Sequence, residues 1–166
     1  MGLEAGDLGM VDKLSVAGRS VNMSKIRARD TKPELLVRRM LHKLGYRYAI
    51  HVKELAGKPD LVFTARRKVI FVHGCFWHQH DRADCSDARR PKSNTGYWTP
   101  KLSRNVERDA EHVSALQGDG WEVLTVWDCE MADAEALKQR LVDFLGAPKA
   151  SCQWPSVALT GEFPPV

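Results

Sequence analysis

Two short apolar runs joined by a three-residue link constrain the fold of this chain more than any other feature. Residues 60–64 read DLVFT and residues 68–74 read KVIFVHG, with only ARR between them. Because so short a link joins neighbouring antiparallel strands, the runs predict a β-hairpin. A third apolar run, WEVLTVW at 121–127, follows a helical segment. A right-handed strand–helix–strand crossover would place it parallel to 68–74.

The remaining periodic segments predict helices around this sheet. Apolar residues recur at helical spacing through TKPELLVRRMLHKLG (31–45). Thr31 and Glu34 form a capping box there. Pro33 fits the first turn, and Gly45 is typical of a helix end. Three further expectations are a strand over YRYAIHV (46–52), a helix beginning after Pro100 with apolar residues Leu102, Val106, Val113 and Leu116, and a final helix over DAEALKQRLVDFLG (133–146). The order of elements predicts an α/β fold with a mixed β-sheet flanked by helices. The all-apolar cores VIFV and VLTV predict strands covered on both faces.

Length and composition favour one domain in the cytoplasm. The chain has 166 residues, and 28% of them are charged. No apolar run approaches the roughly 20 residues of a membrane span, and the N-terminus does not resemble a secretion signal. We expect a flexible N-terminus over 1–18, a single domain with a basic N-terminal arm over 19–146, and a loosely ordered, proline-containing tail over 147–166.

The basic arm carries most of the excess positive charge. Between Arg19 and Lys43 the chain has eight Lys or Arg residues and two acidic ones, within a net charge of +4. Such an arm suits contact with the phosphate backbone of nucleic acid. A solvated helix face would give the same pattern.

A Cys/His loop after the hairpin predicts a metal site. Cys75, His80 and Cys85 lie in one loop, and Cys129 follows the strand that we expect to run parallel beside Cys75's strand. Thiolates and imidazoles suit zinc, and four protein ligands would make the site structural rather than catalytic. Ordinary buried cysteines and surface histidines are the alternative, and Asp81 or Asp84 are weaker candidate ligands. Cys152, in the tail, reads as a free thiol.

Polar residues near the same sheet edge suggest a second site. Asp60, at the mouth of the hairpin, is placed to hold a hard cation such as Mg²⁺, with Glu34 in support. His73 and His78 are then available for acid–base chemistry, which suits metal-assisted phosphodiester hydrolysis. Three of these residues also have a structural explanation: a turn for Asp60, the capping box for Glu34, and the core for His73.

Aromatic residues lie close to basic ones on both sides of this region. Phe76 and Trp77 fall between the expected zinc ligands, and Tyr97 and Trp98 follow a linker containing Arg89, Arg90 and Lys92. This interleaving suits stacking on or wedging between bases. A small hydrophobic core would use the same residues.

Taken in order, the motifs resemble those of the very short patch repair (Vsr) DNA mismatch endonucleases. They are RSVNMSKIRARDTKPE, KPDLVF, FVHGCFWHQH, GYWTPKLSRNVERD and GWEVLTVWDCE. The resemblance covers roughly residues 16–145. It implies a restriction-endonuclease-like fold with a structural zinc loop. It also implies Mg²⁺-dependent nicking of DNA on the 5′ side of the mispaired T in T:G mismatches, which arise when 5-methylcytosine deaminates.

The resemblance also implies roles for individual residues. Asp60 and the Val72 carbonyl would bind Mg²⁺, His78 would act as general base, and His73 and Glu34 would support them. Cys75, His80, Cys85 and Cys129 would bind Zn²⁺. The expected DNA contacts are Phe76, Trp77, Trp98, Asn105, Arg19, Lys25 and Arg27.

Two other functions fit the same residues. A non-catalytic zinc module would bind DNA without Mg²⁺, and a hydrolase with catalytic zinc would use His73 and His78 as ligands. For the nicking enzyme we expect a monomer, since one mismatch needs one nick. The expected partners are double-stranded DNA with a T:G mismatch and, as an open alternative, other repair proteins; no membrane partner is expected.

Overall fold

A three-stranded mixed sheet forms the centre of the molecule. The computed structural model describes residues 18, 21, 29–82 and 84–148. The strands follow the order β1 (Leu61–Phe63), β2 (Lys68–His73) and β3 (Glu122–Trp127). β1 and β2 are antiparallel across the short 3₁₀ helix η1 (Thr64–Arg66), and β2 and β3 are parallel. The predicted hairpin and crossover are both confirmed.

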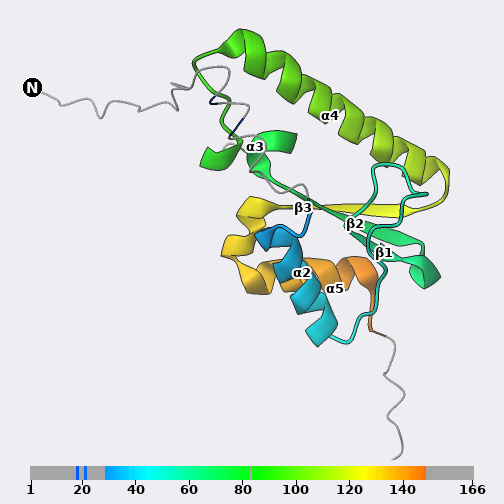
Figure 1. Cartoon of the computed structure of the whole chain (residues 1–166). Coiled ribbons are helices and arrows are strands. Elements are labelled where there is room, and N and C mark those ends of the chain that lie inside the picture. The colour runs from blue at the N-terminus through cyan, green and yellow to red at the C-terminus, as the bar shows by residue number, and fades with distance from the viewer. Residues whose placement is uncertain (1–17, 19–20, 22–28, 83, 149–166) are drawn as a thin grey trace, which may run out of the picture.

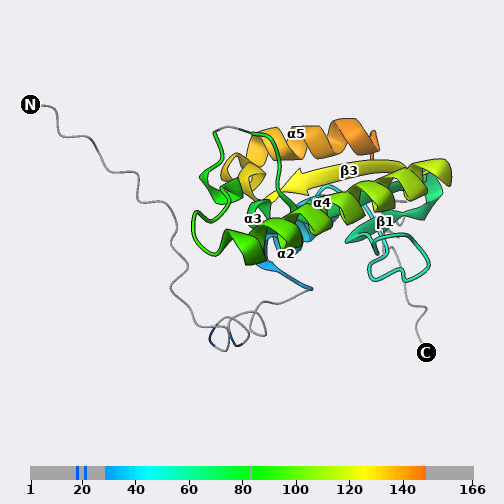
Figure 2. The ribbon, with the colours of Figure 1, turned by 90° about the horizontal axis from the view of Figure 1, so that it is seen from above.

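Helices cover both faces of this sheet (Figures 1 and 2). α2 (Lys32–Lys43) and α5 (Ala134–Leu145) lie on one face, and α4 (Thr95–Gly118) crosses the other. The shorter elements are α3 (Cys75–His78), η2 (Ser86–Ala88) and η3 (Asp128–Ala132). The expected α/β class, a mixed sheet flanked by helices, is therefore confirmed. Among the described residues, no helix has the length and apolar composition that crossing a membrane requires.

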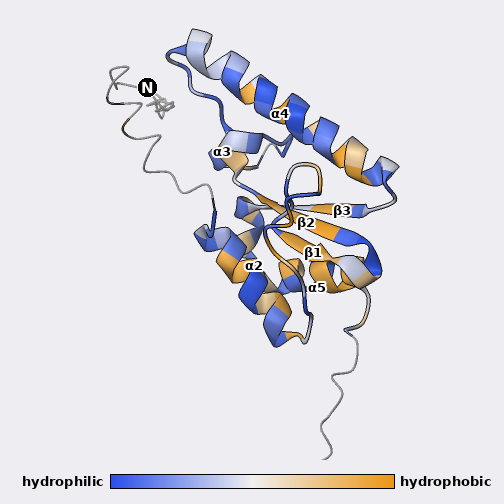
Figure 3. Cartoon of the chain, turned by 45° about the vertical axis from the view of Figure 1, so that its right-hand side comes forward, coloured by the Kyte–Doolittle hydropathy of each residue, from blue (hydrophilic) through white to orange (hydrophobic). Residues whose placement is uncertain are grey.

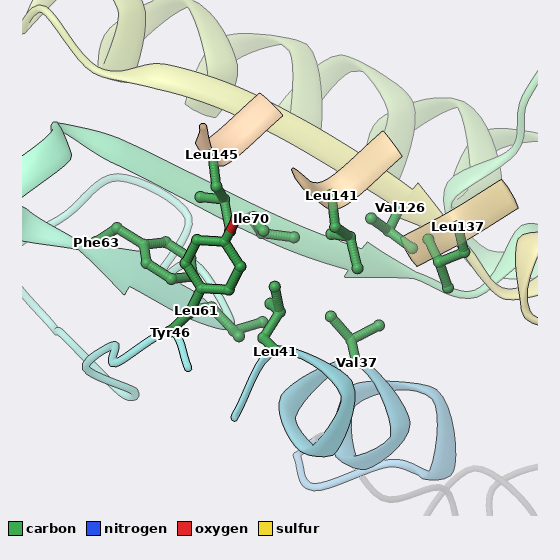
Figure 4. Packing of buried hydrophobic residues seen from close by; sticks show 10 residues of the cluster. All are labelled: Val37, Leu41, Tyr46, Leu61, Phe63, Ile70, Val126, Leu137, Leu141 and Leu145. Atoms are coloured by element: carbon green, nitrogen blue, oxygen red, sulfur yellow. The ribbon is translucent and has the colours of Figure 1, made fainter. Parts of the chain in front are cut away.

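Alternation along β2 divides the core into two clusters. Ile70 packs with Val37 and Leu41 of α2 and with three leucines of α5 (Figure 4). Val69 and Phe71 point to the other face, where Leu116 of α4 meets them. This division follows from the two-residue period of a strand. Figure 3 shows the same pattern: β1 and β2 are mainly hydrophobic, and hydrophobic and hydrophilic residues alternate along the helices.

The start of α2 follows the predicted cap in part. The Thr31 hydroxyl accepts a hydrogen bond from the Glu34 amide at 3.4 Å, and Glu34 Oε2 accepts one from the Asp30 amide at 2.9 Å. Pro33 lies in the first turn, and Gly45 follows the C-cap Leu44 with a φ of +88°. The Thr31 side chain thus satisfies one of the amides that a helix start leaves unpaired, whereas Glu34 reaches the Asp30 amide and not the N-cap amide of a full capping box.

Three expectations about the elements are wrong. Residues 46–52 do not form a strand: Ala49 bridges Val62 through two 2.9 Å hydrogen bonds, and at His51 the backbone turns to a φ of +58°. β3 lies at an edge of the described sheet, so only Val126 of that strand is buried. α4 begins at Thr95 and contains Pro100, because burial of Trp98 in its first turns offsets the one hydrogen bond that proline cannot donate.

The proposed segments at both ends of the chain fall largely outside this region. The segment 1–17, residues 19–20 and 22–28 of the basic arm, and the tail beyond 148 with Cys152 lie outside the described residues. The three-part division of the chain therefore stays a prediction.

Candidate active site and metal centre

A cleft of about 960 Å³ opens at the carboxyl end of β2. Its walls come from the start of α2, the segment 51–58, the loop at α3 and the middle of α4. All four predicted catalytic residues line the cleft. Asp60 and His73 come from the sheet region, His78 from α3 and Glu34 from α2. The structure thus brings together side chains that lie far apart in the sequence.

Asp60 lies immediately before β1 and is held by the next strand. Its Oδ2 accepts a 2.7 Å hydrogen bond from the Val72 amide. Burial, together with the nearby Glu34 carboxylate, raises the pKa of Asp60 to about 6, against the lowering effect of that hydrogen bond. A strand directs the N–H and C=O of one residue to the same side, so the Val72 carbonyl faces the side where Asp60 lies.

This environment fits a hard cation. Asp60 is a partly buried carboxylate whose negative charge is poorly compensated, and a backbone carbonyl beside it would complete an oxygen donor pair. Mg²⁺ is bound in proteins by one or two carboxylates together with other oxygens. The residues present therefore suit the expected magnesium site.

Glu34 is more strongly tied to structure than to the cleft. It is 5% exposed, and its carboxylate bonds the Thr31 hydroxyl at 2.9 Å and Arg38 Nη2 at 3.1 Å. Of the capping box that the sequence predicted, the Thr31 bond to the Glu34 amide is present, but the Glu34 carboxylate bonds the Asp30 amide in place of the N-cap amide. Its effect on Asp60 is electrostatic, through the shared pocket.

His73 and His78 form a stacked pair above the cleft floor. Their ring centroids are 3.9 Å apart and their planes differ by 15°. His78 Nδ1 lies 2.5 Å from Oδ2 of Asp109, a residue of α4. The three residues present potential ligand atoms within 4.8 Å of one another. A carboxylate on Nδ1 fixes the imidazole tautomer and leaves Nε2 as the acceptor nitrogen.

The electrostatics of this trio favour a neutral His73. Burial, together with the adjacent His78, lowers the pKa of His73 to about 4. Burial alone would raise the pKa of Asp109, but the hydrogen bond and charge of His78 hold it below the usual range. Asp109 is therefore a stable carboxylate partner for the His78 ring.

The predicted zinc ligands converge in a second cluster. Ligand atoms of Cys75, His80, Cys85 and Cys129 all lie within 4.8 Å of one another. His80 Nε2 is 3.7 Å from Cys129 Sγ, and the Cys129 amide donates to Cys75 Sγ at 3.4 Å. The parallel pairing of β2 and β3 brings Cys75 and Cys129 to the same sheet edge.

The donor set of this cluster fits zinc. Zn–S bonds are about 2.3 Å long, so sulfur ligands around a tetrahedral zinc lie about 3.8 Å apart. The ligand atoms of this cluster, all within 4.8 Å of one another, are close to that spacing. Burial raises the pKa of the Cys75 thiol to about 12, so this thiol ionises readily only beside a cation. Asp81 and Asp84 are exposed, and Asp84 lies 3.5 Å from Arg82. Neither belongs to the cluster, which favours Cys85 as the fourth ligand.

The three predicted aromatic contacts pack together between α3 and α4. The rings of Phe76 and Trp77 are 4.9 Å apart, and Trp98 lies 5.4 Å and 6.1 Å from them. Phe76 and Trp77 are half-buried, whereas Trp98 is 6% exposed and supports the other two from behind. Lys101 Nζ lies 5.3–5.8 Å from the ring centroids of Trp77, Tyr97 and Trp98.

The remaining predicted DNA contacts divide into two groups. The Asn105 amide donates to the Trp77 carbonyl at 3.0 Å, so it fixes the aromatic loop onto α4. Arg19, Lys25 and Arg27 lie outside the described residues.

Sequence reasoning missed Asp109 and Lys101. Both were readable from one helical face, because Trp98, Lys101, Asn105, Asp109 and His112 recur every three or four residues. The apolar pattern drew attention to neighbouring positions around the same helix instead, where Leu102 and Leu116 are buried as expected but Val106 is 38% exposed.

The known proteins that this chain resembles agree with one another. The family model described as DNA mismatch endonuclease Vsr matches residues 11–84. The type II nicking enzyme V.XorIIP of Xanthomonas oryzae pv. oryzae (strain KACC10331 / KXO85) is 46% identical over 136 residues, covering 82% of this chain and 98% of that protein. The DNA mismatch endonuclease Vsr of Escherichia coli (strain K12) is 40% identical over 149 residues, covering 87% and 94%. Among solved structures, the catalytic domain of homing endonuclease I-Bth0305I has a TM-score of 0.48 and 23% identity, covering 69% of this chain and 94% of that chain.

Proposed function

This chain belongs to the Vsr DNA mismatch endonuclease family, and from that premise we propose that it nicks duplex DNA on the 5′ side of the mispaired T in a T:G mismatch. Such a nick would initiate very short patch repair of deaminated 5-methylcytosine. The observation that carries the proposal is the meeting of Asp60 with the His73–His78–Asp109 trio in one cleft. A metal-binding carboxylate beside an oriented histidine provides the metal ligand and the general base for metal-assisted hydrolysis of a phosphodiester.

Asp60 and the Val72 carbonyl are the residues that would hold Mg²⁺. A cation bound there would neutralise charge on the scissile phosphate and on the oxygens around it. The raised pKa of Asp60 supports this assignment, because an uncompensated carboxylate gains most from a cation. Glu34 adds negative potential from the first turn of α2, where its carboxylate also bonds the Asp30 amide.

His78 is the proposed general base. With Asp109 on Nδ1, its Nε2 is the nitrogen that takes a proton from the attacking water. Asp109 then stabilises the protonated ring, as a carboxylate partner does in other acid–base sites. His73 is neutral, so the ring stacked on His78 does not repel the arriving proton.

The Cys/His cluster would hold Zn²⁺ in a structural role. Four protein ligands leave no open position for substrate. The ligands flank Phe76 and Trp77 in the sequence, so closing the loop around zinc would hold both aromatic side chains in place. We propose that these two rings wedge into the duplex beside the mismatch, where base steps are easier to unstack. Trp98 would support the wedge rather than enter the duplex, since it is buried.

One observation favours a second candidate. The His73, His78 and Asp109 cluster also has the composition of a transition-metal site, which would suit a hydrolase with catalytic zinc. That enzyme would need no Mg²⁺. The carboxylate at Asp60 would then have no chemical role.

A nicking assay on end-labelled duplexes tests the proposal. We expect one nick in the T strand of a T:G duplex, none in the fully paired duplex, and no reaction when Mg²⁺ is omitted. Asp60→Ala should abolish nicking while DNA binding persists. Nicking that persists in that variant would contradict the active site, and binding without cutting by the natural chain would favour the non-catalytic module. The cytoplasmic location, the monomeric state and any repair-protein partner stay predictions.

A further inference from the structure

The segment 51–58 forms one wall of the cleft, and none of its residues has yet been assigned a role. Its backbone has three positive φ values, at His51 (+58°), Gly57 (+69°) and Lys58 (+53°). The Lys58 amide donates to the Leu55 carbonyl at 3.1 Å, which closes a turn just before Asp60. The segment is thus a defined loop whose end leads directly into the active site.

Two contacts hold this loop against the rest of the molecule. Val52, Leu55 and Ala56 pack on the smaller core cluster. At Gly57 the loop approaches α4 so closely that a Cβ would lie 2.7 Å from His112 Nδ1. A loop pinned on both sides presents its side chains in fixed places, which lowers the entropy cost of binding through them.

Lys53 and Lys58 are the cations that this loop adds to the cleft. Both are exposed, and both line the cleft. Neither has an ion-pair partner among the described residues, and the loop's own acid, Glu54, does not line the cleft. Three acids of the cleft have hydrogen-bond partners of their own: Glu34 with Arg38, Asp60 with the Val72 amide, and Asp109 with His78.

We propose that Lys53 and Lys58 each bind a backbone phosphate of the DNA duplex, on the wall of the cleft that residues 51–58 form. This inference rests on the proposed function, since it assumes that DNA occupies the cleft. Lys58 precedes Asp60 by two residues and lines the same cleft, so we expect its phosphate to lie near the reacting one. An ammonium group without an acidic partner suits a phosphate, because it binds the negative charge without requiring a fixed geometry. The contacts position the duplex and carry no sequence information.

The test is the salt dependence of DNA binding by the full chain. Fluorescence anisotropy would measure Kd for T:G and fully paired duplexes over a range of salt concentrations, with divalent cations omitted to prevent cutting. The logarithmic slope changes by about 0.9 for each phosphate contact, so Lys53→Gln with Lys58→Gln should reduce its magnitude by about 1.8. The reduction should be equal on both duplexes. Lys53→Arg with Lys58→Arg should keep the natural slope.

A matched control removes the same charge elsewhere. Arg47→Gln with Lys138→Gln deletes two positive charges, one just after α2 and one on α5; both residues lie outside the basic arm, and neither lines the cleft. The control should leave the slope unchanged. If the loop variant and the control have the same slope, the proposal is wrong. A loss confined to the mismatched duplex would also overturn it, because a phosphate contact does not sense the mismatch.

Failure of this inference is separable from failure of the proposed function. A chain that binds with the predicted slope change but nicks no T:G duplex would keep the lysine contacts and overturn the activity. A chain that nicks T:G duplexes with no slope change in the loop variant would do the reverse. Absence of DNA binding would overturn both.

Discussion

At the scale of single residues, the hydrogen bond between His78 Nδ1 and Asp109 Oδ2 fixes which nitrogen faces the cleft. Asp109→Asn keeps the shape but offers the ring an amide that no longer demands the Nδ1–H tautomer. We expect the nicking rate to fall by about 10²- to 10⁴-fold, the range that a mispositioned general base costs. Single-turnover kinetics on a T:G duplex would measure it.

Glu111→Gln is the matched control for that variant. Glu111 is an exposed acid on the same helix and does not line the cleft. It should nick at the natural rate. Natural activity in Asp109→Asn, with its melting temperature unchanged, would remove Asp109 from the mechanism.

Asp60 gives the site a pH dependence of a definite sign. With its pKa raised to about 6, the metal-free carboxyl holds a proton below that pH, and a cation must displace it. The Mg²⁺ concentration for half-maximal nicking should therefore rise by about tenfold per pH unit below pH 6 and stay level above it. Magnesium titrations across this range would measure the inflection.

A neighbouring variant should move that inflection. Glu34→Gln removes a like charge that raises the pKa of Asp60, so the break should shift to lower pH. A magnesium requirement that does not change with pH through this range would contradict the assignment of Asp60 as the metal-binding carboxylate.

At the scale of elements, the sequence predicted correctly those features that depend on short segments of the chain. The Thr31–Glu34 cap, the hairpin and the parallel crossover all follow from spacing and connection length. The edge position of β3 and the early start of α4 depend on tertiary packing: β3 has no further strand beside it in the described sheet, and Trp98 is buried against α3. No pattern within either segment encodes those neighbours.

The same distinction applies to the site. The metal cluster was predictable because parallel strands end at one edge, which brings Cys75 and Cys129 together. Asp109 was not singled out, because its role depends on how α4 crosses the sheet and meets His78. Motif order suggested the family, but the pairing of side chains required the packed structure.

The loop 51–58 and α4 meet at a contact that only glycine permits. Gly57 has a φ of +69°, and an added Cβ would lie 2.7–2.9 Å from the His112 ring. Gly57→Ala should lower the free energy of unfolding by about 1–3 kcal/mol, through backbone strain and displacement of the ring. Chemical denaturation would measure the change.

Gly118→Ala provides the comparison for this variant. Gly118 ends α4, has no atom within 4 Å of an added Cβ, and should be neutral or slightly stabilising as alanine. Equal stability of Gly57→Ala and the natural chain would show that the loop can move away from His112, and would weaken the idea that it is pinned.

At the scale of the whole molecule, the two faces of the sheet have different tasks. The larger core cluster joins α2, α5 and the sheet, and it includes Val37, Leu41, Ile70, Leu141 and Leu145. The other face carries the smaller cluster, together with α4, the aromatic residues and most of the cleft wall, to which the start of α2 also contributes. Stability and chemistry are therefore largely assigned to opposite layers, so changes around the site need not unfold the chain.

Zinc removal tests this division. The Cys/His cluster closes the loop that carries Phe76 and Trp77, but none of the α2–α5 core residues belongs to that loop. Chelation should abolish nicking and change tryptophan fluorescence, while far-ultraviolet circular dichroism keeps most of its helical signal. The natural chain should contain one zinc ion, since four ligands close one coordination shell.

Single cysteine variants locate the ion within that experiment. Cys85→Ser should weaken zinc binding by more than the 10- to 100-fold that loss of an outer-sphere partner typically costs, because it removes a direct ligand. Cys152→Ser, in the tail, should keep full zinc content and full nicking, as expected of a free thiol. If chelation instead unfolded the helical core together with the loop, the two layers would form one cooperative unit, and zinc would stabilise the whole fold as well as its active face.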